Sequence, residues 1–457
     1  MNILKSFFKP NTIYGSARFL KKREFSYLFK KNNDGYYING TNRLNLKQSF
    51  ENLGIIGSTG GGKGTCIVVP TLLNIDKVSI VATDPKGELS LITKYTLIKK
   101  NYKVKVLDFI DVYNSVRYDP LFRANSFTEI QKLAYILVDS AYPSTGDQAF
   151  WNDGAKNLLT ILITCLHQKK MKTISNLQEL LFLINTDVKK ATSIIQESVP
   201  QSMVKNYESF INGNERTMLS ILETAKTALN LFNDPNVTYL TSFESLCFET
   251  LREEKTAIFI KIPPAEVRYY SFILRIFYTQ LFKFILSDIN SSFPVLLVLD
   301  EFANMGKIPN MSNIASQIRG YNCGFMAILQ DFEQLKATYG DDASSIWNGG
   351  INTKVFYPGL SLNTCKELEQ ILGKQTLKTS EYGFEKNNGT KSSRDKYISR
   401  CLMTVDEIRC LDQNQALLIH KNRRPYKMTM QPYFKNKELM SLIPQNIKCM
   451  LNEKYKK

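Results

Sequence analysis

A glycine-rich segment near the start of the chain constrains the fold more than any other feature. It reads GSTGGGKGT from Gly57 to Thr65, with the apolar run LGII before it and CIVVPTLLNI after it. These flanks predict a buried strand before the segment and a helix after it. The spacing GxxxxGK places Gly57, Gly62 and Lys63 as in loops whose backbone amides surround phosphate groups, with the lysine reaching the β- and γ-phosphates. The start of the helix adds the positive end of its dipole.

All nine residues of this segment are therefore predicted to contact a nucleotide. They are Gly57, Ser58, Thr59, Gly60, Gly61, Gly62, Lys63, Gly64 and Thr65. The residue after the lysine is Gly64, at a position where a Ser or Thr ordinarily binds magnesium. Thr65 is the nearest hydroxyl, so either Thr65 or a water molecule is expected to hold the metal.

A second element is the segment VLLVLDE over Val295–Glu301, a continuous apolar run that ends in two carboxylates. Such a run is typical of a central parallel strand buried on both faces. In an open α/β sheet, ligands bind at the carboxyl ends of the strands. Asp300 is predicted to hold magnesium, directly or through water, and Glu301 to activate the attacking water as a general base. The alternative is that both carboxylates cap the following helix.

Two further polar residues are candidates for the same site. Gln330 ends the apolar run MAILQ and is predicted to lie beside the carboxylates and to sense the γ-phosphate, although a Gln at a strand end can also be structural. Arg319 ends the predicted helix NIASQIR, directly before Gly320. It can complement the helix dipole and the last carbonyls, or act as an arginine finger on phosphates bound by a neighbouring subunit. The residue pattern alone favours neither role for Arg319.

The segment DPKGEL follows the next predicted strand and contains two turn-forming residues. A tight turn here presents Asp84, Lys86 and Glu88 near the nucleotide edge of the sheet. A turn that only caps the following helix is an equally good interpretation.

Strand-like runs fall in two parts of the sequence, with a long gap between them. Within this gap, over residues 121–240, apolar residues recur at three- and four-residue spacing, which predicts an all-α insert. The chain is thus expected to form an α/β domain with a mostly parallel sheet, discontinuous over residues 1–120 and 241–457, interrupted by the all-α domain. A polar, turn-rich stretch over residues 375–396 predicts an exposed hairpin or loop.

The charge of the chain is uneven. It has 59 Lys and Arg against 42 Asp and Glu, a net charge of +17, and residues 1–50 and 421–457 hold most of the excess. If the fold brings these two segments onto one face, they would attract polyanions or an anionic membrane surface; solvated surface lysines are the alternative. The 8 cysteines form no CxxC pair, which favours a reducing, cytoplasmic compartment.

Nine segments, spread in order over nearly the whole chain, resemble the coupling proteins of conjugation and type IV secretion (TraG/VirD type). They are GSARF (Gly15–Phe19), GSTGGGKGTCIVVPTLL (Gly57–Leu73), DPKGEL (Asp84–Leu89), YDPL (Tyr118–Leu121), FWNDGAKNLL (Phe150–Leu159), ERTMLSILETA (Glu215–Ala225), LDEFANMGKIPN (Leu299–Asn310), IRGYNCGFMAILQD (Ile318–Asp331) and LMTVDEI (Leu402–Ile408). The resemblance implies a P-loop NTPase of the RecA-like type that hydrolyses ATP with Mg²⁺ as a ring, usually a homohexamer.

The resemblance also bears on individual residues. Gly64 after the lysine looks like the family's own variant of the phosphate loop, and Arg319 falls where the family carries an arginine that acts in trans. The helical insert over residues 121–240 would meet the relaxase of the relaxosome, DNA or a secreted substrate. Channel loops would bind single- or double-stranded DNA through its phosphates, and Tyr321 and Phe332 could stack on bases, although core packing is the commoner role of such rings.

The family usually begins with transmembrane helices, whereas GSARF here begins at Gly15. The sequence thus predicts an anchorless member, cytoplasmic and peripheral at the inner face of the membrane, which reaches the type IV secretion channel through a small membrane-protein partner or its basic ends. Two alternatives stay open. The chain could be a nucleotide-gated recruitment platform that pumps nothing, or its cargo could be protein effectors.

Overall fold

The computed structural model describes residues 12–28, 33–141, 148–263, 265–288, 293–384 and 391–455. Part of the predicted basic N-terminal segment, residues 1–11, and the tip of the predicted hairpin, residues 385–390, lie outside the described residues.

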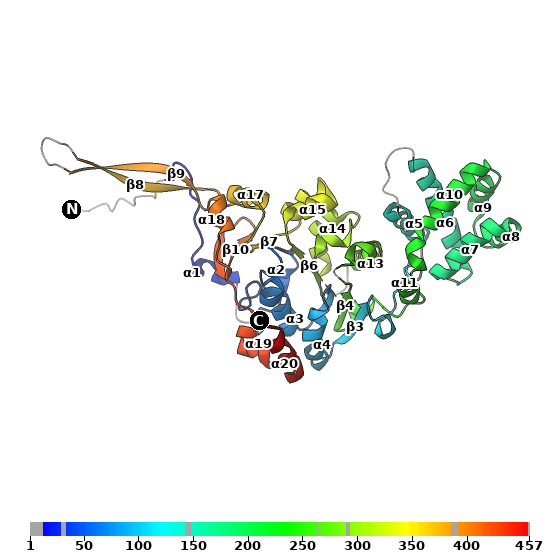
Figure 1. Cartoon of the computed structure of the whole chain (residues 1–457), viewed down its shortest axis with the longest axis horizontal. Coiled ribbons are helices and arrows are strands. Elements are labelled where there is room, and N and C mark those ends of the chain that lie inside the picture. Colours follow the sequence, from blue (N-terminus) through cyan, green and yellow to red (C-terminus); the bar gives the residue numbers. More distant parts are fainter. Residues whose placement is uncertain are drawn as a thin grey trace.

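A sheet of nine strands forms the centre of the molecule (Figure 1). Its strands, in spatial order, are β11 (Tyr426–Thr429), β10 (Gln415–His420), β7 (Thr353–Phe356), β1 (Leu53–Ile56), β6 (Cys323–Leu329), β5 (Val295–Leu299), β2 (Ser79–Thr83), β4 (Thr256–Lys261) and β3 (Lys103–Asp108). The seven strands from β7 to β3 are parallel to one another, whereas β10 is antiparallel to β7 and to β11. The mostly parallel sheet that the sequence predicts is confirmed.

Helices cover both faces of this sheet, which explains why its central strands are apolar throughout. Along β5, Leu296 and Val298 belong to one buried cluster, whereas Leu297 and Leu299 belong to the other. The helices near the first cluster are α3 (Val69–Asn74), α4 (Glu88–Lys99), α19 (Lys437–Ser441) and α20 (Gln445–Tyr455), and those near the second are α13 (Val267–Ser287), α14 (Met311–Gln317), α15 (Phe332–Tyr339) and α17 (Leu362–Leu372).

Shorter helices lie in the connections between these elements. They are α1 (Lys22–Phe25), α2 (Leu46–Ser49), α12 (Thr250–Glu253), α16 (Asp342–Ser344) and α18 (Val405–Arg409).

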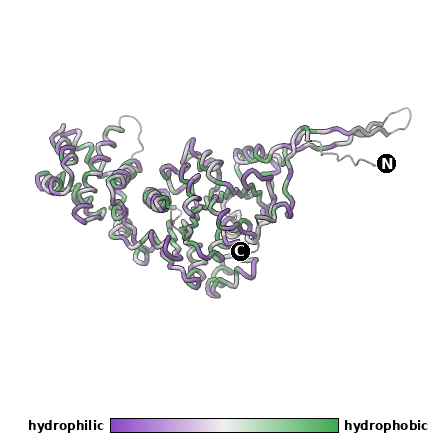
Figure 2. Tube along the Cα trace, turned by 180° about the vertical axis from the view of Figure 1, so that it is seen from behind, coloured by the Kyte–Doolittle hydropathy of each residue, from purple (hydrophilic) through white to green (hydrophobic). Residues whose placement is uncertain are grey.

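A separate helical lobe lies to one side of the sheet, at the right of Figure 1. It contains α5 (Phe127–Ala141), α6 (Gln148–Gln168), α7 (Ile174–Thr186), α8 (Val188–Gln196), α9 (Gln201–Ile211), α10 (Glu215–Ala228) and α11 (Pro235–Leu240). Hydrophobic and hydrophilic residues are interleaved along its helices (Figure 2), as expected for helices that bury one face. None of the described residues between 121 and 240 lies in a strand.

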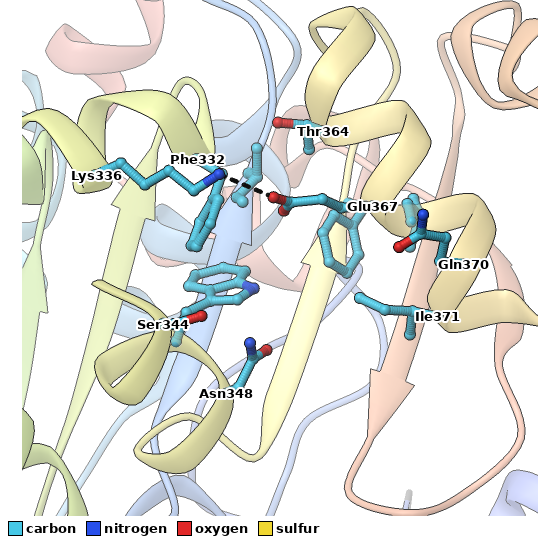
Figure 3. Close-up of a pocket in the computed structure, with 12 residues that line it drawn as sticks. Phe332, Lys336, Ser344, Asn348, Thr364, Glu367, Gln370 and Ile371 are labelled. Atoms are coloured by element: carbon cyan, nitrogen blue, oxygen red, sulfur yellow. Dashed lines mark hydrogen bonds and ion pairs between the residues drawn. The ribbon is translucent and has the colours of Figure 1, made fainter. Parts of the chain in front are cut away.

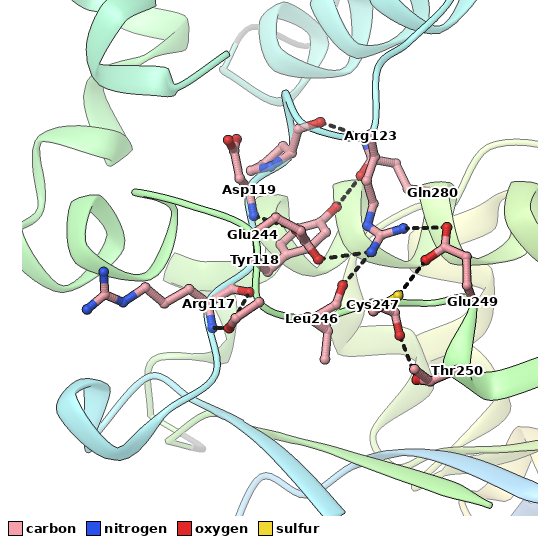
Figure 4. Close-up of polar contacts among 12 residues, drawn as sticks. Arg117, Tyr118, Asp119, Arg123, Glu244, Leu246, Cys247, Glu249, Thr250 and Gln280 are labelled. Carbon is pink, nitrogen blue, oxygen red and sulfur yellow. Dashed lines mark hydrogen bonds and ion pairs between the residues drawn. The ribbon is translucent and has the colours of Figure 1, made fainter. Parts of the chain in front are cut away.

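Two chain segments that join the lobe to the sheet are held together by polar contacts (Figure 4). Arg123 Nη2 lies 2.9 Å from Glu244 Oε1, and its guanidinium carbon lies 3.8 Å from the ring centroid of Phe248. Glu244 also accepts a hydrogen bond of 2.9 Å from the backbone N–H of Asp119. Because Glu244 and Arg123 are 6% and 11% exposed, this pair is well shielded from water and ties the outgoing chain segment to the returning one.

The polar stretch near residue 380 forms a hairpin, which confirms one of the two predicted forms. Strands β8 (Lys374–Phe384) and β9 (Lys391–Cys401) pair with each other, antiparallel, and project from the body at the end away from the helical lobe (Figure 1). At its base, Gln375 in β8 also forms an antiparallel bridge with Ser16.

The two basic segments meet in the fold. The backbone N–H of Leu20 donates to Pro425 O (2.8 Å), and the rings of Phe25 and Tyr426 stack with centroids 5.0 Å apart. Further along, the N–H of Gln431 donates to Asn39 O (2.9 Å). The described part of the N-terminal segment therefore runs beside the C-terminal segment.

Candidate functional site

The carboxyl ends of three adjacent strands bring the predicted nucleotide site together. The phosphate loop begins at Gly57, directly after β1; Gln330 follows β6, and Asp300 follows β5. In the sheet, β6 lies between β1 and β5. Since these strands are parallel, their carboxyl ends lie on the same side of the sheet, hereafter the carboxyl edge. The phosphate loop, Gln330 and Asp300 all lie at this edge.

The phosphate loop has the backbone that its glycines predict. Gly60 and Gly62 have φ of 81° and 88°, in the region that favours glycine. A Cβ on Gly57 would lie 2.4 Å from Cβ of Tyr357, so the close approach of these two chain segments requires glycine at this position. A Cβ at Gly60 or Gly64 would meet no atom within 4 Å, so the loop borders open space.

Lys63 bends back over the loop. Its Nζ donates hydrogen bonds to Gly57 O and, at 3.2 Å, to Ser58 O. Burial lowers the pKa of Lys63, and the charge of Lys86 lowers it further, whereas the nearby charges of Glu301 and Asp300 oppose this change. The lysine is thus partly desolvated and lies within the electrostatic field of both carboxylates.

The hydroxyl that the sequence singles out lies at the start of the helix after the loop. Thr65 Oγ1 donates to Gly62 O (3.2 Å). This helix begins with wide, π-type turns over Gly64–Val68 before it continues as α3. A Thr hydroxyl and the Asp300 carboxylate are oxygen ligands of the kind that Mg²⁺ prefers.

The two carboxylates after β5 differ in their surroundings. Asp300 is partly buried, and burial, together with the nearby charges of Glu301 and Asp84, raises its pKa to about 6; the charge of Lys63 acts in the opposite direction. Glu301 has φ of 56°, which is uncommon for a residue with a side chain and marks a constrained turn.

Both carboxylate oxygens of Glu301 accept hydrogen bonds from amide side chains. Gln330 Nε2 donates to Oε1 (2.9 Å), and Asn304 Nδ2 donates to Oε2 (3.1 Å). Gln330 therefore lies beside the carboxylates, where the sequence places it. Sequence reasoning missed Asn304, although its position three residues after Glu301 in a helical turn was a usable signal.

Arg319 lies elsewhere. It follows α14 and precedes β6, so it lies at the opposite, amino edge of the sheet, where its Nη1 is 2.7 Å from Glu51 Oε1. The 7 residues of β6 separate Arg319 from Gln330 by roughly 23 Å, more than an arginine side chain can bridge. Arg319 therefore cannot contact the phosphate loop of its own chain.

The DPKGEL turn is mainly a helix cap. Asp84 is 1% exposed, and its carboxylate accepts hydrogen bonds from the backbone N–H groups of Leu89 (3.1 Å) and Ser90 (2.8 Å) and from the Ser90 hydroxyl (2.7 Å). Burial raises the pKa of Asp84. The capping interpretation accounts for Asp84, whereas Lys86 is exposed at the carboxyl edge.

A pocket of about 420 Å³ lies outside the predicted nucleotide site (Figure 3). Ile56 and Phe356 at the ends of β1 and β7 line it, and the ion pair of Lys336 Nζ with Glu367 Oε1 (3.1 Å) lies at its edge. The predicted nucleotide contacts do not line this pocket. Phe332 also lines it and is 4% exposed, so this ring belongs to the core.

The fold and the site together define a P-loop NTPase of the RecA-like type, with a mostly parallel sheet. Over residues 15–457 the chain matches the family described as "Type IV secretory system Conjugative DNA transfer", and it belongs to this family. It is similar to Protein VirD4 of Rhizobium radiobacter (24% identical over 408 residues, 86% of this chain and 58% of VirD4) and to the conjugal transfer protein TraG of Escherichia coli (27% over 389 residues, 76% and 60%). The chain thus spans less than two thirds of the length of these relatives.

The fold is also that of a solved structure, the plasmid coupling protein TrwB in complex with ADP and Mg²⁺. The two share a TM-score of 0.69 at 16% sequence identity, over 91% of this chain and 94% of TrwB. None of the helices in the described residues is long and apolar enough to span a bilayer.

Proposed function

We propose that this chain is an ATP-hydrolysing coupling protein of conjugative DNA transfer, which recruits a relaxase–DNA complex to a type IV secretion channel and drives DNA transfer as a ring. The observation that carries this proposal is the convergence of the phosphate loop, Asp300, Glu301 and Gln330 at the carboxyl edge. Family membership and the ADP and Mg²⁺ bound by TrwB support it.

The residues at the carboxyl edge suit a nucleoside triphosphate and Mg²⁺. The loop Gly57–Thr65 borders open space and starts a helix, and Lys63 would exchange its bonds to Gly57 and Ser58 for phosphate oxygens. Thr65 and Asp300 would hold Mg²⁺, Thr65 directly or through water; the metal neutralises charge on the phosphates when it is bound.

The chemistry assigned to this chain's own residues is proton transfer and positioning. Glu301 would take a proton from the attacking water, because its carboxylate is fixed by the amides of Gln330 and Asn304. Gln330 would sense the γ-phosphate from the same place.

Arg319 would act on a neighbouring subunit. Because it lies at the amino edge, its only route to a phosphate is the site of another chain, which suits a ring with nucleotide bound between subunits. We propose a homohexamer in the active state.

We assign recognition of the relaxase, DNA or other substrate to the all-α domain over residues 121–240, and the motor to residues 1–120 and 241–457. Channel loops would bind single- or double-stranded DNA through phosphates, with Tyr321 as a stacking candidate. The protein would work at the inner face of the membrane, held by channel proteins, a small membrane-protein partner or the joined basic segments of the two ends.

The test is ATP hydrolysis by the purified protein without DNA, with single-stranded DNA and with double-stranded DNA, with particle mass followed in the same samples. DNA should raise the rate and shift the mass to that of a ring, and Lys63→Ala should abolish hydrolysis. If DNA changes neither rate nor mass, the motor proposal is wrong. The protein is then better described as a recruitment platform, or as a coupling ATPase for protein effectors if such a partner assembles it.

A further inference from the structure

A nearly buried carboxylate lies beside Arg319 at the amino edge of the sheet. The side chain of Glu51 is 5% exposed; its Oε1 lies 2.7 Å from Arg319 Nη1 and its Oε2 lies 2.7 Å from Lys421 Nζ. Burial of a carboxylate is costly unless the charge is paired. Here two cations share this one carboxylate, and both remain accessible to solvent, Arg319 at 58% and Lys421 at 41%.

The backbone around Arg319 is fixed on both sides. The side chain of Asn52, which follows Glu51, donates to Ala315 O (2.9 Å) in the helix before Arg319. Arg252 Nη2 donates to Tyr321 O (2.7 Å) in the turn after it. Because the neighbouring residue Ile318 is fully buried, the main freedom left at this position is that of the exposed arginine side chain itself.

Glu51 limits that remaining freedom. A guanidinium has five N–H donors in a planar fork, and the one ion pair with Glu51 involves Nη1. A group that is more than half exposed can keep this contact while its other donors face outward. An anchored guanidinium loses less conformational entropy when it meets a phosphate than one that must first be ordered.

We propose that Glu51 is the positioning residue of Arg319: it holds the guanidinium at the amino edge, directed toward phosphates bound by the neighbouring chain, while Lys421 keeps the buried carboxylate paired as the arginine engages. This inference rests on the proposed function, since it requires a site shared between subunits. Lys421 can keep Glu51 paired because its backbone is fixed in the turn after β10, where its N–H donates to Asn352 O (2.7 Å).

The first test is the DNA-stimulated hydrolysis rate of Glu51→Gln. We expect kcat to fall about tenfold, with the KM for ATP changed less than about twofold, because Glu51 lies far from the nucleotide site of its own chain and Arg319 acts on charge that develops in the transition state at the neighbour's site. In the background of Arg319→Ala, Glu51→Gln should cause no further loss of kcat. If the ion pair only stabilised the fold, its loss in Glu51→Gln would instead lower the melting temperature, and any effect on kcat would be independent of Arg319.

The second test mixes chains. Glu51→Gln chains mixed with Lys63→Ala chains should regain the normal rate at interfaces where the intact nucleotide site of a Glu51→Gln chain meets the Arg319 of a Lys63→Ala chain, which is still paired with Glu51. If mixing does not restore the hydrolysis rate that Glu51→Gln lowers, the inference is overturned. Mixing Arg319→Ala chains with Lys63→Ala chains tests the shared site itself. If this second mixture does not regain hydrolysis, or if DNA stimulates no hydrolysis in the unchanged protein, the proposed function is wrong and the inference falls with it.

The matched control is Glu244→Gln, which removes another buried glutamate that is paired with an arginine, at 2.9 Å from Arg123. It should lower the melting temperature without the selective, Arg319-dependent loss of kcat. If Glu51→Gln does not fold, Glu51→Asp retains the charge but moves it by one methylene. If kcat of Glu51→Asp, and the dependence of that kcat on salt concentration, both equal those of the unchanged protein, the inference is also overturned.

Discussion

Charged side chains are arranged differently at the two edges of the central sheet. At the carboxyl edge, carboxylates lie near one another, and Lys63 turns back on its own loop. The pKa of Asp300 is raised and that of Lys63 is lowered, so both shifts favour the uncharged form. At the amino edge, Glu51 is paired with two cations. The comparison indicates that the carboxyl edge is organised to receive a charged ligand, whereas the amino edge is organised to hold a side chain in place.

The largest expected effect comes from the amino edge. Arg319→Ala should lower the hydrolysis rate of the assembled protein about 10³-fold, because an arginine finger stabilises charge in the transition state. Nucleotide affinity of the unassembled chain should not change, since Arg319 lies far from its own loop. Hydrolysis rate and nucleotide binding measured on the same preparation check this, and a loss of binding by the isolated chain would show that the two edges are not separate in function.

At the carboxyl edge, Glu301→Gln should lower the hydrolysis rate about 10²-fold or more, because a general base is lost. ATP binding should persist, since the loop and Asp300 are intact. Single-turnover hydrolysis and equilibrium binding separate the two quantities. A variant that still transfers DNA without hydrolysis would show that hydrolysis does not drive transfer.

The raised pKa of Asp300 predicts a pH dependence of metal binding. Asp300 has a folded pKa of about 6, so below this pH a proton must leave before the metal binds, and Mg²⁺ affinity should fall up to tenfold for each further unit of pH. Above pH 6 the affinity should be nearly constant. Titration of Mg²⁺ in the presence of ATP between pH 5 and pH 8 measures this, and an affinity that is flat down to pH 5 would contradict the prediction.

The same shift affects stability with a definite sign. Because the folded pKa of Asp300 lies above its ordinary value of 3.8, the folded state binds more protons between about pH 4 and pH 6, and stability from this group falls as pH rises through that window. Asp300→Asn should remove this fall. Denaturant unfolding at pH 4.5 and pH 7 compares the two proteins.

The smallest effect is expected for the amides that hold Glu301. Asn304→Ala should lower the hydrolysis rate about fivefold, because one hydrogen bond of about 1 kcal/mol is lost. Gln330→Ala should cost more if it also senses the γ-phosphate, and an equal cost in the two variants would argue against a sensing role. The double variant should lose less than the product of the two single effects, since both amides act on the same carboxylate.

Much of the fold could be predicted because its signals are local. Glycines at fixed spacing, a strand without polar residues and helical periodicity over residues 121–240 each depend on a few neighbouring side chains. The strands β7, β10 and β11 were missed. β7 and β11 have only 4 residues each, and β11 alternates between exposed and less exposed positions at the sheet margin, which gives a weak strand signal. The apolar run of β10, with 6 residues, was a usable signal that sequence reasoning missed.

The sequence by itself determined the class of chemistry: a loop whose glycines leave open space for phosphate, and a strand that ends in carboxylates. Only the tertiary structure decided which residues meet. It brought Asn304 and Gln330 to opposite oxygens of Glu301, and it paired Arg319 with Glu51, 268 positions earlier in the chain. The physical reason is that ligand-binding loops follow from backbone conformation, which is encoded locally, whereas the pairing of charges depends on strand order, which the burial of both sheet faces sets for the whole chain.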